Sequence, residues 1–96
     1  MINIFIKDKN VIIMKPLYYL EFARSKDDNG QLIPAKELFW YVPSYQKIAY
    51  EDPYLCAKAR YEAQSDSSKY VVRYRQASWF KNLRIRFSDD WVIIKE

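Results

Sequence analysis

The sequence predicts a mainly β (α+β) protein, a small antiparallel β-barrel or sandwich with one surface helix and a protruding hairpin loop. Three observations predict it. Apolar and polar residues alternate with period two in the segments near the C-terminus, as in sheets with one buried face. A run of helix-forming residues follows Asp52-Pro53. The chain's one glycine, Gly30, stands in a polar stretch between two aromatic segments, where a chain reversal is expected.

The N-terminal residues 1–14 are expected to form an arm or hairpin outside the main domain. Two short β-prone runs, at residues 2–6 and 11–14, flank a polar stretch. Residues 15–96 are expected to form one small β-barrel domain, because 96 residues are about the size of a single domain. No apolar run approaches the ~18 residues of a membrane-spanning helix, so no membrane association is expected.

The first half of the main domain predicts two strands joined by a reversal. Residues 17–22 (LYYLEF) and 38–42 (LFWYV) are aromatic and aliphatic, which is typical of strands. Residues 25–35 are expected to be exposed, and mobile in an isolated subunit, because the turn is rich in Asp, Asn, Ser and Gly. The candidate interface residues of this loop are Asn29, Gly30, Leu32 and Ile33.

A surface helix is expected over residues 53–64. Asp52 is a good N-cap and Pro53 suits the first helical position. The helical spacing brings Tyr54 and Tyr61 onto one face, and both are candidate interface residues. Cys56 falls in the first turn, where the helix dipole lowers a thiol pKa, but without a histidine base we expect it to be a small buried residue.

Strands are expected at residues 69–75, 83–87 and 91–94. If the first two pair, four arginines share one outer face: Arg73, Arg75, Arg84 and Arg86. Such a face would contact phosphates or an acidic protein, or its charges would pair with acidic residues of the same chain. The residues expected in the core are Tyr70, Val72, Tyr74, Leu83, Ile85, Phe87 and Ile93.

The composition argues against an enzyme. The chain has no histidine, one cysteine and one glycine, which excludes histidine-based nucleophile pairs, zinc cages and glycine-rich phosphate loops. Adjacent carboxylates fall beside turns and a helix start, where they cap backbone groups. We therefore expect no catalytic residues, no metal and no cofactor. Nine tyrosines and an aromatic share of 18% instead indicate surfaces that a partner buries.

The order of these features resembles the head–tail adaptor (head-closure, connector) proteins of long-tailed bacteriophages. The likeness spans about residues 15–96: an opening strand (LYYLEF), a turn followed by I-P-x-K-x-L-F (KDDNGQLIPAKELF), and an aromatic strand. A middle segment precedes two basic strands (YVVRYRQ and LRIRF) and a W-x-I strand (WVII). Two departures are that family members continue into one more strand, and that the first thirteen residues match nothing in the pattern.

The resemblance implies a structural virion protein located in the neck of a tailed phage, and in the host cytoplasm during assembly. Its fold would be a small antiparallel barrel carrying a helix. Its subunits would form a homo-oligomeric ring that connects the portal to tail proteins and retains packaged DNA, with non-specific DNA contact. Two other classes fit the sequence: a small phage-encoded inhibitor of a host protein, and a small nucleic-acid-binding β-barrel.

Overall fold

The centre of the protein is a four-stranded mixed sheet, seen in a computed structural model that describes residues 3–7, 10–65 and 69–95. The strand order is β5 (Tyr70–Gln76), β3 (Tyr18–Arg24), β4 (Ile48–Tyr50) and β6 (Val92–Ile94). β3 pairs antiparallel with both β4 and β5, whereas β6 joins β4 in parallel. The expected barrel is therefore wrong for this part of the chain: the fold is α+β and its sheet is open, with β5 and β6 as edges.

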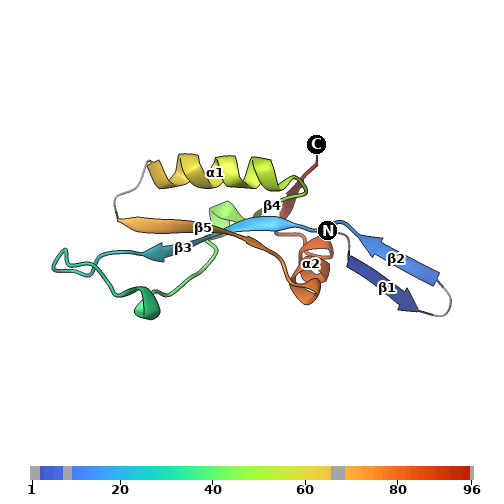
Figure 1. The fold of residues 1–96 in the computed structure, drawn as a ribbon, viewed down its shortest axis with the longest axis horizontal. Helices are drawn as coiled ribbons and strands as arrows, with labels where there is room; N and C mark the ends of the chain where they lie inside the picture. Colours follow the sequence, from blue (N-terminus) through green and yellow to red (C-terminus); the bar gives the residue numbers. More distant parts are fainter. Residues whose placement is uncertain (1–2, 8–9, 66–68, 96) are drawn as a thin grey trace.

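A separate two-stranded hairpin precedes the sheet. β1 (Asn3–Lys7) pairs antiparallel with β2 (Asn10–Met14), in a register that sets Phe5 opposite Ile12. Figure 1 shows this hairpin extending away from the body of the molecule, which contributes to an elongated shape of 57 × 26 × 24 Å.

Two helices lie on opposite faces of the sheet (Figure 1). The longer helix, α1 (Pro53–Ser65), packs Cys56 and two alanines against Leu20, Phe22 and Val72. On the other face, Ile85 of α2 (Trp79–Arg86) joins a second cluster. That cluster consists of Leu17, Tyr19, Ala49, Ala77 and Ile85, with Val42, Trp91 and Ile93 packed against it.

The start of α1 agrees with the local signals in the sequence. The Asp52 side chain accepts a 2.9 Å hydrogen bond from the backbone nitrogen of Tyr54, as an N-cap does, and Pro53 occupies the first helical position. The helix expected at residues 53–64 is confirmed. None of the helices in the described ranges is long and apolar enough to cross a membrane.

The strand expected at residues 83–87 is wrong, because this segment belongs to α2. Ser78 caps the helix by accepting a hydrogen bond from the backbone nitrogen of Lys81 at 3.2 Å. The helix buries Asn82 and Ile85, three positions apart and therefore on one helical face. Ile85 packs into a cluster on the sheet and Asn82 donates to the Lys15 carbonyl, and these tertiary contacts outweigh the local period-two pattern.

The strand expected at residues 38–42 is also wrong. One residue of this segment, Tyr41, forms an isolated bridge to Phe22 of β3, with two backbone hydrogen bonds of 2.8 and 2.9 Å. Two short 3₁₀ turns, η1 (Ala35–Glu37) and η2 (Ser44–Gln46), lie before and after this segment. Each turn directly follows a proline, which has no N–H to donate to a strand ladder.

The expected core is only partly correct. Val72 and Ile85 are buried, Ile93 packs against the second cluster, and Leu83 is half-buried. Tyr70, Tyr74 and Phe87 are exposed instead. The two tyrosines lie on an edge strand, and Phe87 is the C-cap of α2, so none of the three is enclosed by neighbouring elements.

Candidate protein-interaction site

Two of the predicted interface arginines, Arg73 and Arg75, share a carboxylate on the sheet face opposite α1. Arg73 contacts Glu21 through Nε and Nη2, each 2.8 Å from Oε1, and Nη1 of Arg75 lies 3.6 Å from the same oxygen. The Arg73 guanidinium also lies 4.1 Å from the ring centroid of Trp40. Two positive charges with one carboxylate leave a net positive surface on β5.

The other two arginines lie on α2, so the four do not form the expected stripe. Arg84 is exposed on α2. Arg86 donates from Nε to Oδ1 of Asn82 at 2.7 Å and from Nη2 to the carbonyl oxygen of Lys15 at 2.7 Å. Arg86 therefore holds the segment before β3 against α2, which is a structural role. The interpretation of one continuous arginine face is wrong because the helix replaces the strand that would have carried two of its members.

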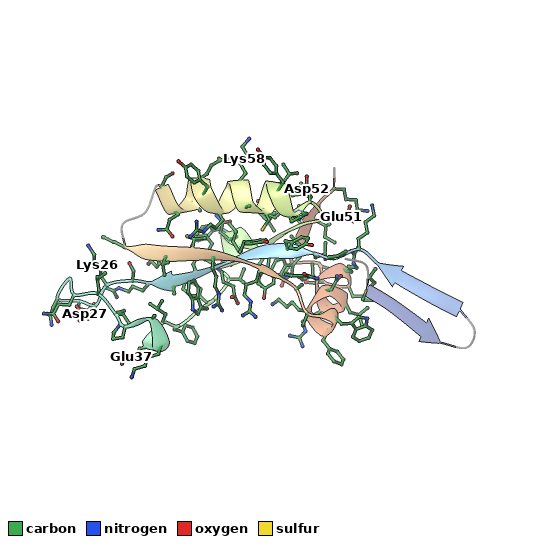
Figure 2. All side chains as sticks on the ribbon, viewed as in Figure 1. Lys26, Asp27, Glu37, Glu51, Asp52 and Lys58 are labelled. Atoms are coloured by element: carbon green, nitrogen blue, oxygen red, sulfur yellow. The ribbon has the colours of Figure 1, made fainter. Side chains whose placement is uncertain are left out.

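Gly30 lies in a closed reversal whose backbone groups are paired. Its φ is +79°, a left-handed conformation that favours glycine. The Gly30 nitrogen donates to the Asp27 carbonyl at 3.0 Å, and the Asp27 carboxylate accepts from the nitrogens of Asn29 and Gln31 at 2.9 Å each. Figure 2 shows Lys26 and Asp27 at the extremity of this loop. A cavity of about 270 Å³ beside it is lined by Arg24, Lys26, Asp27, Asp28, Gly30 and Lys69.

An apolar group of side chains, here called the loop surface, follows the reversal. Its members are Leu32, Phe39, Tyr41 and Tyr45. Leu32, Phe39 and Tyr45 are 76–78% exposed, and the rings of Phe39 and Tyr41 stack with centroids 6.3 Å apart. Leu32 was predicted as an interface residue and is exposed, whereas Ile33 beside it is half-buried. Phe39 and Tyr45 were not predicted as interface residues; Phe39 falls in the aromatic run 38–42 that was interpreted as a strand.

The outer side of α1 carries the two predicted tyrosines. Tyr54 and Tyr61 are each 72% exposed, and their separation by seven residues puts them two turns apart on one side of the helix. Figure 2 shows Lys58, midway between them in sequence, on the side of α1 that faces away from the sheet. We call Tyr54, Lys58 and Tyr61 the helix surface.

A third exposed apolar group, the α2 surface, is formed by Phe80 and Phe87. They are 73% and 82% exposed, and the Phe80 ring packs edge-on against Trp79 with centroids 4.9 Å apart. From the sequence, Phe80 is a candidate for stacking on nucleic-acid bases and not a predicted protein-interface residue, and Phe87 is expected in the core. Helical spacing, seven residues between two aromatic side chains with a Ser cap before them, was the signal that could have found this surface.

Lys81 is enclosed by two rings on the α2 side of the sheet. Its Nζ atom lies 5.4 Å from the Tyr19 ring centroid and 5.3 Å from that of Trp91, which are cation–π geometries. Burial, and then the neighbouring Arg84, lower the pKa of the Lys81 ammonium. Burial, and then Glu21, raise the pKa of the Tyr19 hydroxyl. These contacts fix α2 to the sheet.

The described ranges hold no cluster of three or more potential metal-ligating side chains. Cys56 is fully buried against β3 and β5, and this burial raises its pKa from 9.0 to about 12. A thiol in this state is a poor nucleophile, because the thiolate is the reactive form. The exposed features considered as interaction surfaces are the loop surface, the helix surface, the α2 surface and the paired arginines of β5.

Comparison of the chain with models of protein families, with curated proteins and with solved structures finds no significant match.

Proposed function

We propose that this protein is a head–tail adaptor, or head-closure, subunit of a tailed bacteriophage. In this role its copies form a ring in the virion neck that connects the portal to tail proteins and helps to retain packaged DNA. The proposal starts from the order of sequence motifs over residues 15–96. It does not depend on a barrel, since the sheet of the described residues is open.

The observation that carries the proposal is the distribution of the three exposed apolar surfaces. The helix surface lies on α1, on one side of the sheet, whereas the α2 surface lies on the other side (Figure 1). The loop surface lies in the long connection between β3 and β4. A ring subunit needs different surfaces for its two neighbours, because head-to-tail contacts are heterologous. It also needs surfaces for the rings above and below.

The size of the exposed groups supports an assembling subunit over a free-standing one. Seven large apolar side chains are 72–82% exposed: Leu32, Phe39, Tyr45, Tyr54, Tyr61, Phe80 and Phe87. Six of these seven are aromatic residues, Phe or Tyr, of the kinds enriched at protein interfaces. Scattered exposed apolar residues need no explanation, but groups on three elements of one small chain favour contact with several partners.

The arrangement of the arginines gives less support to the nucleic-acid-binding alternative. Arg73 and Arg75 share Glu21, and Arg86 is bound to the Lys15 carbonyl, so three of the four predicted arginines have partners within the chain. A backbone-tracking groove needs free cations beside stacking aromatics. In the proposed ring, DNA contact is a secondary, non-specific property of a chain with a net charge of +4.

Solution mass and portal binding together test the proposal. We expect the sedimentation coefficient of the purified protein to rise with concentration, and electron microscopy of the protein mixed with a portal from its phage to show an added ring on the portal. The double variant Tyr54→Asp with Tyr61→Asp alters exposed positions of the helix surface, so it should keep the fold and weaken this assembly. A protein that stays monomeric and leaves the portal bare would contradict the adaptor and favour an inhibitor of a host protein.

A further inference from the structure

One half of the free edge of β5 is already covered by side chains of α1. The Gln64 amide donates to the Tyr70 carbonyl at 3.0 Å and accepts from the Val72 nitrogen at 2.8 Å. Nε of Arg60 donates to the Val72 carbonyl at 3.0 Å. Figure 1 shows α1 running alongside β5. An edge strand is a template for pairing with another chain, and these contacts block its first part.

Among the residues that the structure describes, no hydrogen bond covers the second half of the same edge. Alternate residues of a strand direct their backbone groups to the same side. Val72 faces away from β3, since both of its groups bond to α1, and the backbone groups of Tyr74 and Gln76 therefore face outward too. The next residue, Ala77, points the other way: its backbone nitrogen donates to the Leu17 carbonyl, on the β3 side, at 2.8 Å. β5 thus presents a short free edge at residues 74–76.

The other edge of the sheet presents a free edge of the same length. β6 has three residues. The Val92 nitrogen donates to the Lys47 carbonyl at 3.0 Å, and the Ile94 carbonyl accepts from the Glu51 nitrogen at 3.2 Å, so Val92 and Ile94 face β4. By the same alternation, the backbone groups of Ile93 face outward.

We propose that residues 74–76 of one copy pair in parallel with β6 of the next copy. The occupant of the open edge is therefore a second copy of this chain, and the proposal rests on the ring function proposed above. β5 and β6 run in the same direction within a subunit, because β3 is antiparallel to β5 and β4, and β6 is parallel to β4. Copies that repeat in the same orientation around a ring present these two edges to each other as a parallel pair.

The side chains agree with this pairing when Tyr74 lies beside Val92. Tyr74 lies on the α1 side of the sheet, opposite Leu20. Val92 and Ile94 lie on that same side, since Ile93 between them packs into the cluster on the other side. Tyr74, Val92 and Ile94 are 45%, 58% and 36% exposed in one copy, so the pairing covers apolar surface from both partners.

Charge also favours this partner. Asp89 and Asp90 lie shortly before β6, with Trp91 between them and the strand, and the register brings them near Arg73 of the neighbouring copy, on the positive part of β5. Asp90 already lies 3.5 Å from the Lys47 ammonium of its own chain, so Asp89 carries this contact. A two-fold dimer in which two β5 edges pair antiparallel would set Arg75 against its own symmetry mate, and like charges directly opposite are destabilising. The geometry therefore favours the heterologous contact of a ring.

The first test removes one outward N–H without disturbing the sheet. Gln76→Pro deletes a donor that faces away from β3, a place where edge strands tolerate proline. Gln76→Ala is the matched control, because it shortens the same side chain and keeps the N–H. We expect both variants to keep the circular dichroism spectrum of the parent, Gln76→Ala to self-associate like the parent, and Gln76→Pro to self-associate about tenfold more weakly in sedimentation. Equal association of the two folded variants would overturn the pairing.

The second test maps the contact with cysteines. A copy carrying Tyr74→Cys is mixed with a copy carrying Val92→Cys and treated with a short bismaleimide. Cys56, the one native cysteine, is buried and contributes little background. Joining of the two variants supports the pairing, whereas joining of Tyr74→Cys copies to each other, or no joining, overturns it.

The outcomes of these tests separate the two proposals. Cross-linking of the Tyr74→Cys and Val92→Cys copies without portal binding would support the strand pairing and contradict the proposed function in the neck. A ring on the portal without that cross-link would support the proposed function and contradict the strand pairing.

Discussion

The side chain of Asn82 joins Arg86 to the segment that precedes the sheet. Its Oδ1 accepts from Nε of Arg86 at 2.7 Å, and its Nδ2 donates to the Lys15 carbonyl at 2.9 Å. Asn82 is 0% exposed, and among the described residues no buried side-chain nitrogen or oxygen lacks a hydrogen-bond partner. This buried amide holds α2 against the start of β3.

We expect Asn82→Ala to destabilise the protein by about 1–3 kcal/mol, because it removes two hydrogen bonds and leaves a buried polar group of its neighbours less satisfied. Urea denaturation followed by circular dichroism measures the change. Arg84→Ala, at an exposed position on the same helix, is the control and should stay within about 0.5 kcal/mol of the parent. Equal effects of the two changes would contradict the role of Asn82.

Glu21 is the shared partner of two arginines, and its side chain is 14% exposed. We expect Glu21→Gln to lower the free energy of unfolding by about 1–2 kcal/mol, because it leaves two guanidinium groups together on one sheet face. Denaturant unfolding at low salt is the measurement. The control is Arg24→Gln, whose partner Asp28 is 92% exposed, and it should have almost no effect because exposed ion pairs contribute little.

Cys56 should resist labelling in the native protein. Its burial raises the thiol pKa from 9.0 to about 12, so the thiolate is scarce at neutral pH and the sulfur is inaccessible. We expect maleimide to react fast with the urea-unfolded chain and at least about a hundredfold more slowly with the folded one, since reaction then requires unfolding. Fast labelling of folded protein would show that α1 opens readily from the sheet.

The same thiol predicts a stability change at alkaline pH. Its folded pKa is above its unfolded value, so the contribution of the neutral thiol is fully present below pH 9 and is lost as the pH rises from 9 toward about 12. The loss should approach about 1.4 kcal/mol per pH unit within this window. Tyrosines titrate there too, so the measurement is the difference between the parent and Cys56→Ala. Parallel pH profiles would refute the prediction.

We expect substitutions of Gly30 to lower the free energy of unfolding. No atom lies within 4 Å of the position that a Cβ would occupy, so the penalty for Gly30→Ala comes from its φ of +79°. We expect a loss of about 1–2 kcal/mol in thermal or urea unfolding. Gly30→Asn is the control and should lose less, because asparagine tolerates left-handed backbone better. An equal loss for both would contradict the backbone explanation.

The apolar part of the loop is expected to act in assembly. The double variant Leu32→Asp with Ile33→Asp changes one exposed and one half-buried side chain of the loop and should keep the fold. A loop lengthened by a few Gly-Ser residues should keep the fold too, since doubling a loop costs only about 0.6 kcal/mol. Both should abolish ring assembly in sedimentation or on the portal. Gln31→Asp, at an exposed position in the same loop, is the control. Normal assembly of the altered loops would make this stretch an ordinary hairpin.

Local signals in the sequence were sufficient to predict a helix, strands and several exposed residues. Asp52 and Pro53 define the start of α1, because capping involves neighbours in sequence and needs no tertiary contact. The strand expected at residues 17–22 is confirmed as β3, and that expected at 69–75 as β5, each shifted by one or two residues. The candidate surface residues Leu32, Tyr54 and Tyr61 are exposed as their positions beside a turn and on a helix suggested.

The remaining elements depended on what the segments pack against. Residues 83–87 alternate like a strand, yet burial of Asn82 and Ile85 made them helical, and this dispersed the expected arginine face. Residues 38–42 have strong β propensity, yet they follow Pro34 and the turn η1, and one residue pairs with β3.

The sequence by itself determined where α1 begins, where the chain reverses at Gly30, and that the segments of β3, β5 and β6 are strands. Caps, turns and alternation act between residues close in the chain, so a single sequence reveals them. The tertiary structure alone decided that the sheet stays open, that α2 is a helix, and that Gln64 covers half of the β5 edge. Those outcomes depend on hydrogen bonds and burial between residues distant in sequence, whose free energies exceed the differences in local propensity.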